Sequence, residues 1–463
     1  MLARSVRRSG DARDATAGSA PTAKEDAADA WAGLAFSGAA ATRSSNAAQR
    51  QQNCKGSGSR SSGGFRPGLR LDSLEKTLGW REGGLGLSLL LVATATEWAG
   101  PARLPRELVR AGFDVSVFAP KRALVAKSRY AGAVTHLPDA ATPMQWAYML
   151  AASLGEHTPR LIVPCDDTAL QLMMTFVESP PPGIENSVRE RILALIRESL
   201  GDPRFYRPSI DKTLLPPAAE ALGVRVPPFQ IVSGVDAART FADAQGYPIV
   251  LKRAFGTAGQ AVEVVPEKAQ LEPAFRKLIA KGDATLWKSA NLLIQAWIPG
   301  KGLLHAVAAW GGVVYAGMTR EVLMRSSATG PSTVVRCRHA PEARHFAELL
   351  ASGFGVSGFF GPEFIEHEHT GDVYLIEINR RVTNGVQMGG LVGVDLCAAL
   401  AAALENRAYT GRPDIPADEE HLIAEFPQEW LRDATSPYLR IARTDVPWDD
   451  RRLLQAMLEM RAK

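Results

Sequence analysis

The feature that most constrains this fold is an alternation of short apolar runs and amphipathic helical segments that begins at Leu87. The run LSLLLVATA (87–95) predicts a buried strand, and PARLPRELVRAGF (101–113) predicts a helix. The pattern repeats as far as RLIVPCDD (160–167). Strands that alternate with helices indicate an α/β unit with a parallel sheet. The first strand-to-helix turn, ATATEWAGPA, lacks the GxGxxG pattern, so dinucleotide binding is not indicated.

Residues 1–86 differ in composition from the rest of the chain. They are rich in Ala, Ser, Gly and Arg and include GSGSRSSGG at 56–64. With few spaced apolar residues they cannot offset the entropy cost of folding, so we expect a disordered low-complexity tail. Acidic residues such as Asp11, Asp14 and Glu25 argue against a transit peptide. Whether the tail belongs to the mature protein is left open.

Charge and cysteine content narrow the functional classes. The tail carries 13 Lys+Arg against 8 Asp+Glu, which leaves 40 against 41 for the remainder of the chain. Without a basic stripe, a nucleic-acid partner is not expected. No apolar run approaches the ~20 residues of a membrane helix. Cys54, Cys165, Cys337 and Cys397 lie far apart, which is typical of free thiols in a reducing cytoplasm.

A first candidate for ligand binding is the segment YPIVLKRAFGTAGQAVEVV (247–265). It predicts two strands joined by a loop that contains Gly256 and Gly259. Such a loop lets backbone N–H groups approach phosphate oxygens, and Lys252 would add a positive charge. The alternative is a plain hairpin whose lysine stem lies along the surface, and for this segment alone that interpretation is favoured.

A second candidate is EFIEHEHTGDVYLIEIN (363–379), which predicts a hairpin. Glu377 and Asn379 are two residues apart and therefore share one face of the return strand. Charges are seldom buried unpaired, and carboxylate and amide oxygens, including Glu363, suit Mg²⁺ whose shell is completed by water and phosphate. His367 and His369 fall at the turn, where a solvated turn is favoured over a metal site.

Two acidic residues follow the fourth predicted strand. Asp166 and Asp167 stand where α/β sheets place their ligands. The favoured interpretation is nevertheless structural: a helix N-cap followed by an acidic first turn.

Taken together, in this order and spacing, these segments of residues 210–406 resemble the ATP-grasp superfamily, in the branch of biotin carboxylase, carbamoyl phosphate synthetase and D-alanine ligase. The resemblance implies a mixed α/β and α+β chain in which a doubly wound pre-ATP-grasp domain precedes a two-lobed ATP-grasp domain. The expected divisions are the tail at 1–86, the pre-ATP-grasp domain at 87–182, a linker helix and small lobe at 183–290, the large lobe with the metal site at 291–406, and a C-terminal extension at 407–463.

The resemblance also implies roles for individual residues. The expected Mg²⁺ (or Mn²⁺) ligands are Glu363, Glu377 and Asn379. The expected ATP-binding residues are Lys212, Lys252, Gly256, Gly259, Gln295, Ala296, Trp297 and Ile298, where the two lysines contact phosphates and 295–298 form the adenine hinge. The expected catalytic residues are Arg381, which orients the acceptor carboxylate, and Arg320, a second basic group near the transferred phosphate.

Three departures from the family pattern stand out. Pro216 and Pro217 interrupt the helix expected after Lys212, so that helix must kink or begin later. Lys301 lies where an acidic ribose-binding residue is often found, and Thr257 and Ala258 separate the loop glycines. None of these changes removes a metal or phosphate ligand.

The expected function is an ATP-dependent ligase that joins a small-molecule carboxylate to an amine through an acyl phosphate. The alternatives are an ATP-grasp kinase, a non-catalytic ATP-binding regulator, and an α/β protein of unrelated function. A cytoplasmic location is expected, and a homodimer is compatible with the sequence. The particular carboxylate and amine carry no signature in the sequence.

Overall fold

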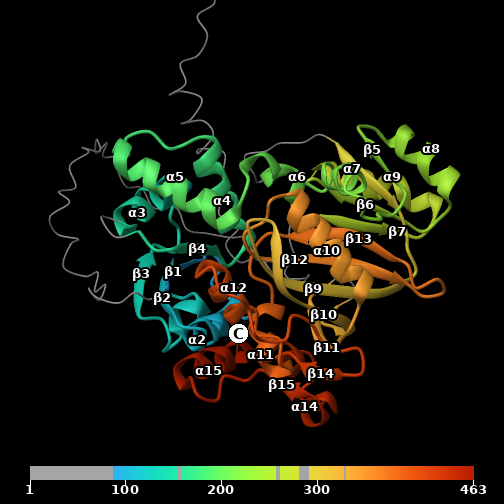
Figure 1. The fold of residues 1–463 in the computed structure, drawn as a ribbon. Coiled ribbons are helices and arrows are strands. Elements are labelled where there is room, and N and C mark those ends of the chain that lie inside the picture. The colour runs from blue at the N-terminus through green and yellow to red at the C-terminus, as the bar shows by residue number, and fades with distance from the viewer. Residues whose placement is uncertain (1–86, 155–157, 257–260, 281–290, 328–329, 463) are drawn as a thin grey trace, which may run out of the picture.

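The computed structural model describes residues 87–154, 158–256, 261–280, 291–327 and 330–462 (Figure 1). The predicted disordered tail therefore lies outside the described residues. Within them the chain forms three sheets, one of them wholly parallel and two mainly antiparallel. The expectation of a mixed α/β and α+β fold is confirmed.

The first sheet is the doubly wound unit. Its strand order is β3-β2-β1-β4, and all its pairings are parallel. The strands are β1 (Leu87–Val92), β2 (Phe113–Pro120), β3 (Ala133–Leu137) and β4 (Leu161–Pro164). Helix α2 (Leu104–Arg110) packs on one face, while α3 (Pro143–Leu154), α4 (Asp167–Glu178) and α5 (Asn186–Leu200) pack on the other. Alternate residues of β1 supply the two faces, because successive side chains of a strand point in opposite directions.

The second sheet is small and antiparallel, with the order β5-β8-β6-β7. Its strands are β5 (Phe229–Val232), β6 (Ile249–Arg253), β7 (Val262–Val265) and β8 (Leu292–Ala296), and α8 (Val235–Gln245) and α9 (Leu271–Ala280) cover it. Because β8 pairs with β5 and β6, this sheet extends past the predicted lobe boundary at residue 290. The crossing to the next sheet falls at 297–299.

The third sheet has seven strands in the order β13-β12-β9-β10-β11-β14-β15. They are β9 (Gly300–Trp310), β10 (Val313–Arg325), β11 (Ser332–Arg338), β12 (Gly358–His367), β13 (Val373–Asn379), β14 (Glu420–Ala424) and β15 (Arg443–Thr444). Helix α10 (Pro341–Gly353) packs on one face. Helices α11 (Gly385–Val392) and α12 (Leu396–Leu404) pack on the other, where they share a core with β1, β2 and α2. The first and third sheets are thereby joined by one continuous apolar core.

Short helices connect the first sheet to the second. Helix α6 (Tyr206–Ile210) ends just before Lys212, and α7 (Leu215–Ala221) follows. Pro216 and Pro217 occupy the first turn of α7, where a missing N–H costs no intrahelical hydrogen bond. The helix thus begins later rather than kinking, which was one of the two outcomes expected from these prolines.

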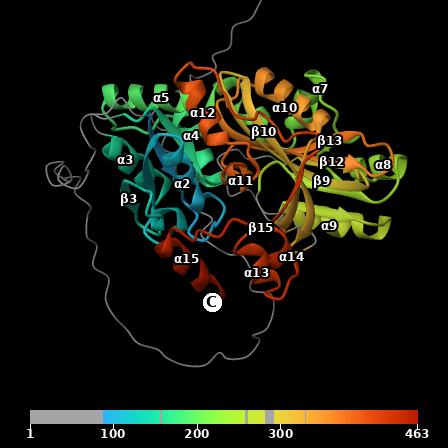
Figure 2. The ribbon, with the colours of Figure 1, turned by 60° about the horizontal axis from the view of Figure 1, so that its bottom comes forward.

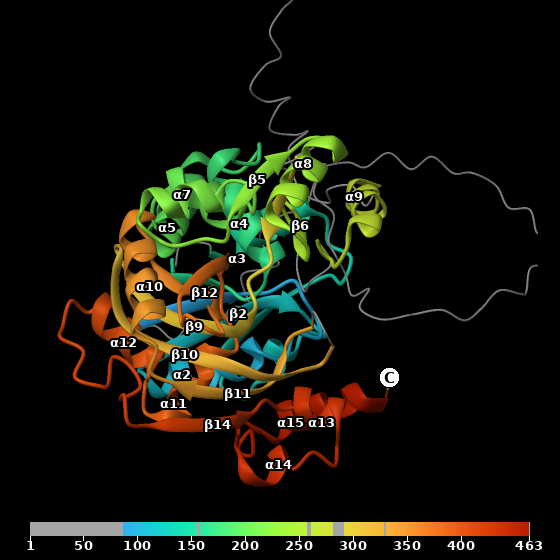
Figure 3. The same ribbon diagram turned by 90° about the vertical axis from the view of Figure 1, so that its right-hand side faces the viewer.

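Residues 407–462 pack back against the body. In Figure 3 the small-sheet helices α8 and α9 lie at one end, the C-terminal elements lie at the opposite end, and the large sheet lies between them. Strand β14 extends the large sheet by antiparallel pairing with β11, and β15 pairs in parallel with β14. Helices α13 (Gln428–Arg432) and α14 (Tyr438–Ile441) lie between these two strands in the chain. Helix α15 (Arg451–Leu458) follows β15 and reaches the first domain beside 124–127 (Figure 2).

A buried ion pair fastens this segment to the first domain. Arg103 lies 2.7 Å from Asp445, and the two side chains are only 5% and 4% exposed. Arg103 also donates to the carbonyl oxygen of Phe426, and Asp445 accepts from the Phe426 N–H at 2.7 Å. Burial raises the pKa of Asp445, and Arg103 opposes that shift.

We expect Arg103→Met to destabilise the protein by about 3–5 kcal/mol, because Asp445 would be left buried without a cation. Thermal and urea unfolding of the full chain measure this loss. Adding Asp445→Asn should restore much of the stability, since the uncompensated charge is then gone. A loss below about 1 kcal/mol in the single variant would contradict the anchoring role of the pair.

In the part of the chain that the structure describes, no single helix is both long and apolar enough to cross a bilayer. Helices α11 and α12 reach the required composition only when taken together, and the chain bends by 104° between them. Both helices are largely buried in the shared core.

Candidate active site

The hairpin of β12 and β13 brings the three predicted metal ligands together. Glu363 and Glu377 are directly opposite each other in the register, as are Gly361 and Asn379. The Asn379 Nδ2 donates a hydrogen bond of 2.7 Å to Glu363 Oε1. This pairing places the two carboxylates opposite each other on β12 and β13, with the Asn379 amide two residues along β13 on the same face.

The two predicted phosphate lysines reach the same place from other elements. Lys212 lies in the connection between α6 and α7, and its Nζ is 2.9 Å from Glu377 Oε1. The same ammonium donates to the Gly256 carbonyl at 3.1 Å. Lys252, on β6 of the small sheet, donates to the Ile376 carbonyl of β13 at 3.1 Å. All five polar side chains therefore gather where the small and large sheets meet.

Burial and mutual charge set the protonation of this cluster. Burial, followed by the Glu377 carboxylate, raises the pKa of Glu363. Burial also pushes the pKa of Glu377 upward, but the Lys212 ammonium outweighs it and the pKa lies below its usual range. Burial lowers the pKa of Lys252 to about 8, against the opposing pull of Glu377. The Glu377 carboxylate repels the ionised form of Glu363, and a cation shared by the two carboxylates would relieve this repulsion.

This donor set fits Mg²⁺. Among the described residues no group of three or more His, Cys, Asp or Glu side chains is placed to hold a metal ion. Mg²⁺ commonly binds through one or two carboxylates and keeps water and phosphate oxygens in its remaining positions. Two glutamates and one amide oxygen are what such a site requires. Burial and the nearby Glu377 carboxylate raise the pKa of Glu363, and a cation would stabilise its ionised form.

Arg381 is held beside this cluster by residues of the first domain. Its Nε lies 2.9 Å from Asp167 Oδ2, and its guanidinium stacks on the Trp98 ring with 4.8 Å to the centroid. Asp167 is the first residue of α4 and lines a pocket together with Lys212 and Glu377. The sequence placed Asp167 where α/β sheets bind their ligands but favoured an acidic first turn for it, and it did not single out Trp98. Trp98 follows strand β1 and Asp167 follows strand β4, and this position at the ends of parallel strands could have marked them as site residues.

Asp166 confirms the capping interpretation. Its side chain accepts from the Ala169 N–H at 2.9 Å, as an N-cap should. It also accepts from the Thr94 N–H at 2.6 Å and from the Thr94 hydroxyl at 2.7 Å. Asp166 thereby connects the loop after β1 to the start of α4. Trp98 lies in that loop and Asp167 is the first residue of α4, so the two segments that contact Arg381 are linked.

Arg320 lies on the same sheet as Glu363 and pairs with a carboxylate of the C-terminal segment. It lies on β10, separated from Glu363 on β12 by the intervening strand β9. Its buried guanidinium is 3.7 Å from Glu425, which follows β14. Glu425 in turn accepts from Ser332 at 2.6 Å and from Asn384 at 2.8 Å. The side chain that Arg320 faces thus comes from the C-terminal segment.

The expected adenine hinge is the connection from the small to the large sheet. Gln295 is buried and Ala296 ends β8, with its N–H donating to the Pro228 carbonyl at 2.9 Å. Trp297 and Ile298 lie in the crossing, where the Trp297 side chain is 44% exposed. The segment is thus placed at the joint between the two lobes.

The glycine loop is described only in part. Gly256 is the last described residue before the loop, and its φ of +140° is a conformation that favours glycine. Gly259, Thr257 and Ala258 lie outside the described residues. Lys301 is near Glu321 at 3.6 Å. At the hairpin turn, the His367 Nδ1 accepts from the Thr370 N–H at 3.2 Å, in keeping with an exposed turn rather than a metal site.

The chain is similar in sequence to known proteins over the segment that holds these side chains. Residues 210–385 match the family model of the ATP-grasp domain. The chain is 24% identical over 261 residues to the carbamoyl phosphate synthase arginine-specific large chain of Cutaneotrichosporon cutaneum, covering 52% of this chain and 21% of the relative. It is 27% identical over 206 residues to the carbamoyl phosphate synthase large chain of Hyperthermus butylicus, covering 42% and 18%. The chain therefore spans about a fifth of the length of the relatives it matches.

Solved structures share the fold across most of the chain. Biotin carboxylase from Campylobacter jejuni superposes with a TM-score of 0.57 at 19% identity, covering 73% of this chain and 75% of that one. N5-carboxyaminoimidazole synthetase from Staphylococcus aureus gives 0.54 at 12% identity, covering 74% and 83%. The domain match identifies residues 210–385 as an ATP-grasp domain. The likeness to these solved structures shows a shared fold over most of the chain.

Proposed function

We propose that this protein is an ATP-dependent carboxylate–amine ligase. The observation that carries the proposal is the single cluster formed by Lys212, Lys252, Glu363, Glu377 and Asn379 between two lobes. Relatives in this superfamily support it: the biotin carboxylase domain of Hydrogenobacter thermophilus 2-oxoglutarate carboxylase was solved with MgADP and bicarbonate.

Each group in the cluster has a role under this proposal. Glu363, Glu377 and Asn379 would hold Mg²⁺, which supplies charge neutralisation at the phosphate oxygens. Lys212 and Lys252 would neutralise the terminal phosphates, and 295–298 would hold adenine. The Gly256 loop, including Gly259, would cover the phosphates. These residues act mainly by positioning and electrostatics, as is general for phosphoryl transfer.

The reaction would proceed in two displacements. A carboxylate oxygen attacks the γ-phosphorus, the bond to the β-phosphate oxygen breaks, and ADP leaves. The amine nitrogen then attacks the acyl carbon, phosphate leaves, and the nitrogen loses a proton as the amide forms. Arg381 would orient the carboxylate, because its planar guanidinium can form two parallel hydrogen bonds with that anion. Arg320 would assist with a second positive charge.

We expect ADP release from ATP to require Mg²⁺, a productive carboxylate and an amine. Incubation with pooled carboxylates and hydroxylamine should yield a hydroxamate, and an ¹⁸O-labelled carboxylate should transfer one ¹⁸O to the released phosphate. A stable phosphorylated product that ignores hydroxylamine would indicate a kinase instead. Tight MgATP binding without turnover across the pool would favour a non-catalytic regulator.

A further inference from the structure

A second pocket lies where the first domain, the large lobe and the C-terminal segment meet. It holds about 200 Å³ and shares no lining residue with the pocket at Lys212 and Glu377. That volume corresponds to roughly seven water molecules in the liquid. Pockets at such junctions are common ligand sites.

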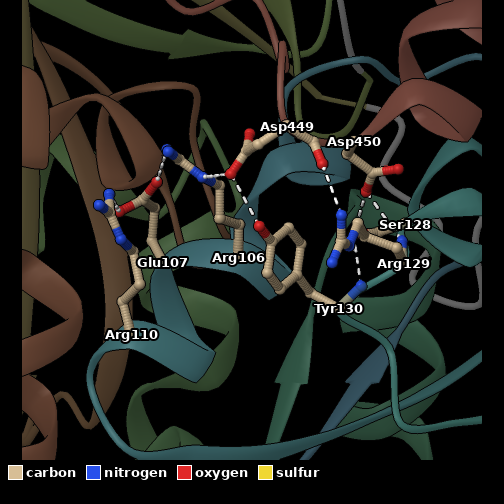
Figure 4. Close-up of polar contacts among 8 residues, drawn as sticks. All are labelled: Arg106, Glu107, Arg110, Ser128, Arg129, Tyr130, Asp449 and Asp450. Atoms are coloured by element: carbon tan, nitrogen blue, oxygen red, sulfur yellow. Dashed lines mark hydrogen bonds and ion pairs between the residues drawn. The ribbon is translucent and has the colours of Figure 1, made fainter.

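The charged groups around this pocket already have partners. Arg103 pairs with Asp445 at 2.7 Å. Arg106 bonds Asp449 through Nε at 2.6 Å and Glu107 through NH1 at 2.8 Å (Figure 4). An ionic ligand would have to compete with these pairs and would pay its own desolvation cost.

The acidic residues of the C-terminal segment are satisfied in the same way. Asp450 accepts from the Ser128 hydroxyl at 2.9 Å and from the Arg129 N–H at 2.8 Å, and the Tyr130 hydroxyl donates to Asp449 at 2.7 Å (Figure 4). Asp450 also caps α15 through the Leu453 N–H. These bonds hold the C-terminal wall of the pocket against the first domain.

Among the lining residues, Gln387 has neither a hydrogen bond nor an ion pair with another described residue through its side chain, whereas the buried Arg103 and Asp445 at least pair with each other. Gln387, on α11, is only 4% exposed, yet neither its Nε2 nor its Oε1 has a hydrogen-bond partner among the described residues. A buried amide without partners is costly, so such groups in native proteins call for an explanation. A ligand that presents an acceptor beside a donor would satisfy both atoms at once.

Five of the lining residues are apolar. Leu391, Val446, Pro447 and Leu453 line the wall, and Trp448 stands at the pocket with its side chain 74% exposed. An exposed indole offers a flat face on which a planar ring can stack. Because the charged lining groups are already paired with one another, the apolar surface and the amide of Gln387 favour a compact and uncharged ligand.

We infer that this pocket binds a small, neutral, planar molecule whose edge carries a hydrogen-bond donor next to an acceptor, such as an aromatic amide or a nucleobase. Glutamine pairs with edges of this kind in two parallel hydrogen bonds. The inference goes beyond the proposed ligase function and does not depend on it, because no residue of the Lys212–Glu377 cluster takes part.

Three probes of the same shape test the charge of the ligand. Benzamide is neutral, benzoate is its anionic counterpart and benzamidine is its cationic counterpart. Calorimetric titration of the full chain should show benzamide binding at least about tenfold more tightly than either ion. Tighter binding of benzoate or benzamidine would overturn the inference, and so would the failure of both benzamide and uracil to bind.

Variants test the position of the site. Gln387→Met keeps the length of the side chain and removes both polar atoms, so benzamide affinity should fall at least about tenfold. Without ligand, its melting temperature should be equal to or above that of the parent, because an unsatisfied amide has been removed. Val446→Phe should block binding by filling the pocket. Gln245→Met, at an exposed glutamine of α8, is the control. Unchanged benzamide affinity in Gln387→Met would refute the assignment, as would a clear loss of stability.

Discussion

Glu377→Gln is expected to reduce ATP turnover by on the order of 10²–10³-fold or more, while the fold stays intact. Glu377 carries the carboxylate that Lys212 contacts at 2.9 Å and that opposes the lowering of the Lys252 pKa. The substitution preserves size but removes the charge that would bind Mg²⁺ and balance the lysines. Its side chain is 32% exposed, so a neutral amide there is readily solvated.

The measurement has two parts. ADP formation gives the turnover, and calorimetric titration with ATP in the presence of Mg²⁺ or of EDTA gives the metal-dependent part of binding. Glu368→Gln, at the exposed turn of the same hairpin, is the matched control and should behave like the parent. Near-normal turnover in Glu377→Gln would remove this residue from the metal site.

Lys252→Met is expected to weaken ATP binding by roughly 10- to 100-fold, since a charge-assisted contact to phosphate would be lost. The same change should leave the ligand-free protein as stable as the parent or more so. Lys252 is 7% exposed, and its depressed pKa shows that burial disfavours its charge. Methionine fills similar space without a charge to desolvate.

The pH dependence provides a second readout. With a pKa of about 8 in the folded protein against 10.5 for the free side chain, Lys252 loses its proton in the native state first. Between about pH 8 and pH 10.5, Lys252 is more protonated in the unfolded chain than in the folded protein. The contribution of Lys252 therefore makes the free energy of unfolding rise with pH over this range. The affinity for the ATP phosphates should fall as the pH rises through the same range, because Lys252 loses its positive charge.

Both trends should disappear in Lys252→Met and persist in Lys268→Met, an exposed lysine beside Asp243. If ATP affinity and its pH profile are the same in Lys252→Met as in the parent, Lys252 does not contact the nucleotide.

Local patterns predicted much of the fold. The apolar run at 87–95 and the prolines at 216–217 act over a few residues, and the structure follows them. The lobe boundary was harder to place, because β8 takes its partners from β5 and β6, and pairing between distant strands leaves no mark within the strand itself.

In the candidate site, too, local neighbours could be predicted from the sequence and contacts between distant residues could not. Glu377 and Asn379 could be grouped because they are neighbours on one strand. The partnership of Arg381 with Asp167, and that of Arg320 with Glu425, join residues from distant parts of the chain. An aspartate after a strand predicts a helix cap equally well, and nothing local distinguishes Gln387 from a solvent-facing helical glutamine. Such contacts depend on how the domains pack.

The pairing of β11 with β14 also has a consequence for biosynthesis. Glu425 and Asp445 leave the ribosome after the arginines that they neutralise, Arg320 and Arg103. Until then the nascent chain holds two uncompensated guanidinium groups and an open strand edge on β11. Chaperone association should therefore persist until the last strands emerge, and early termination should produce aggregation rather than a smaller working enzyme.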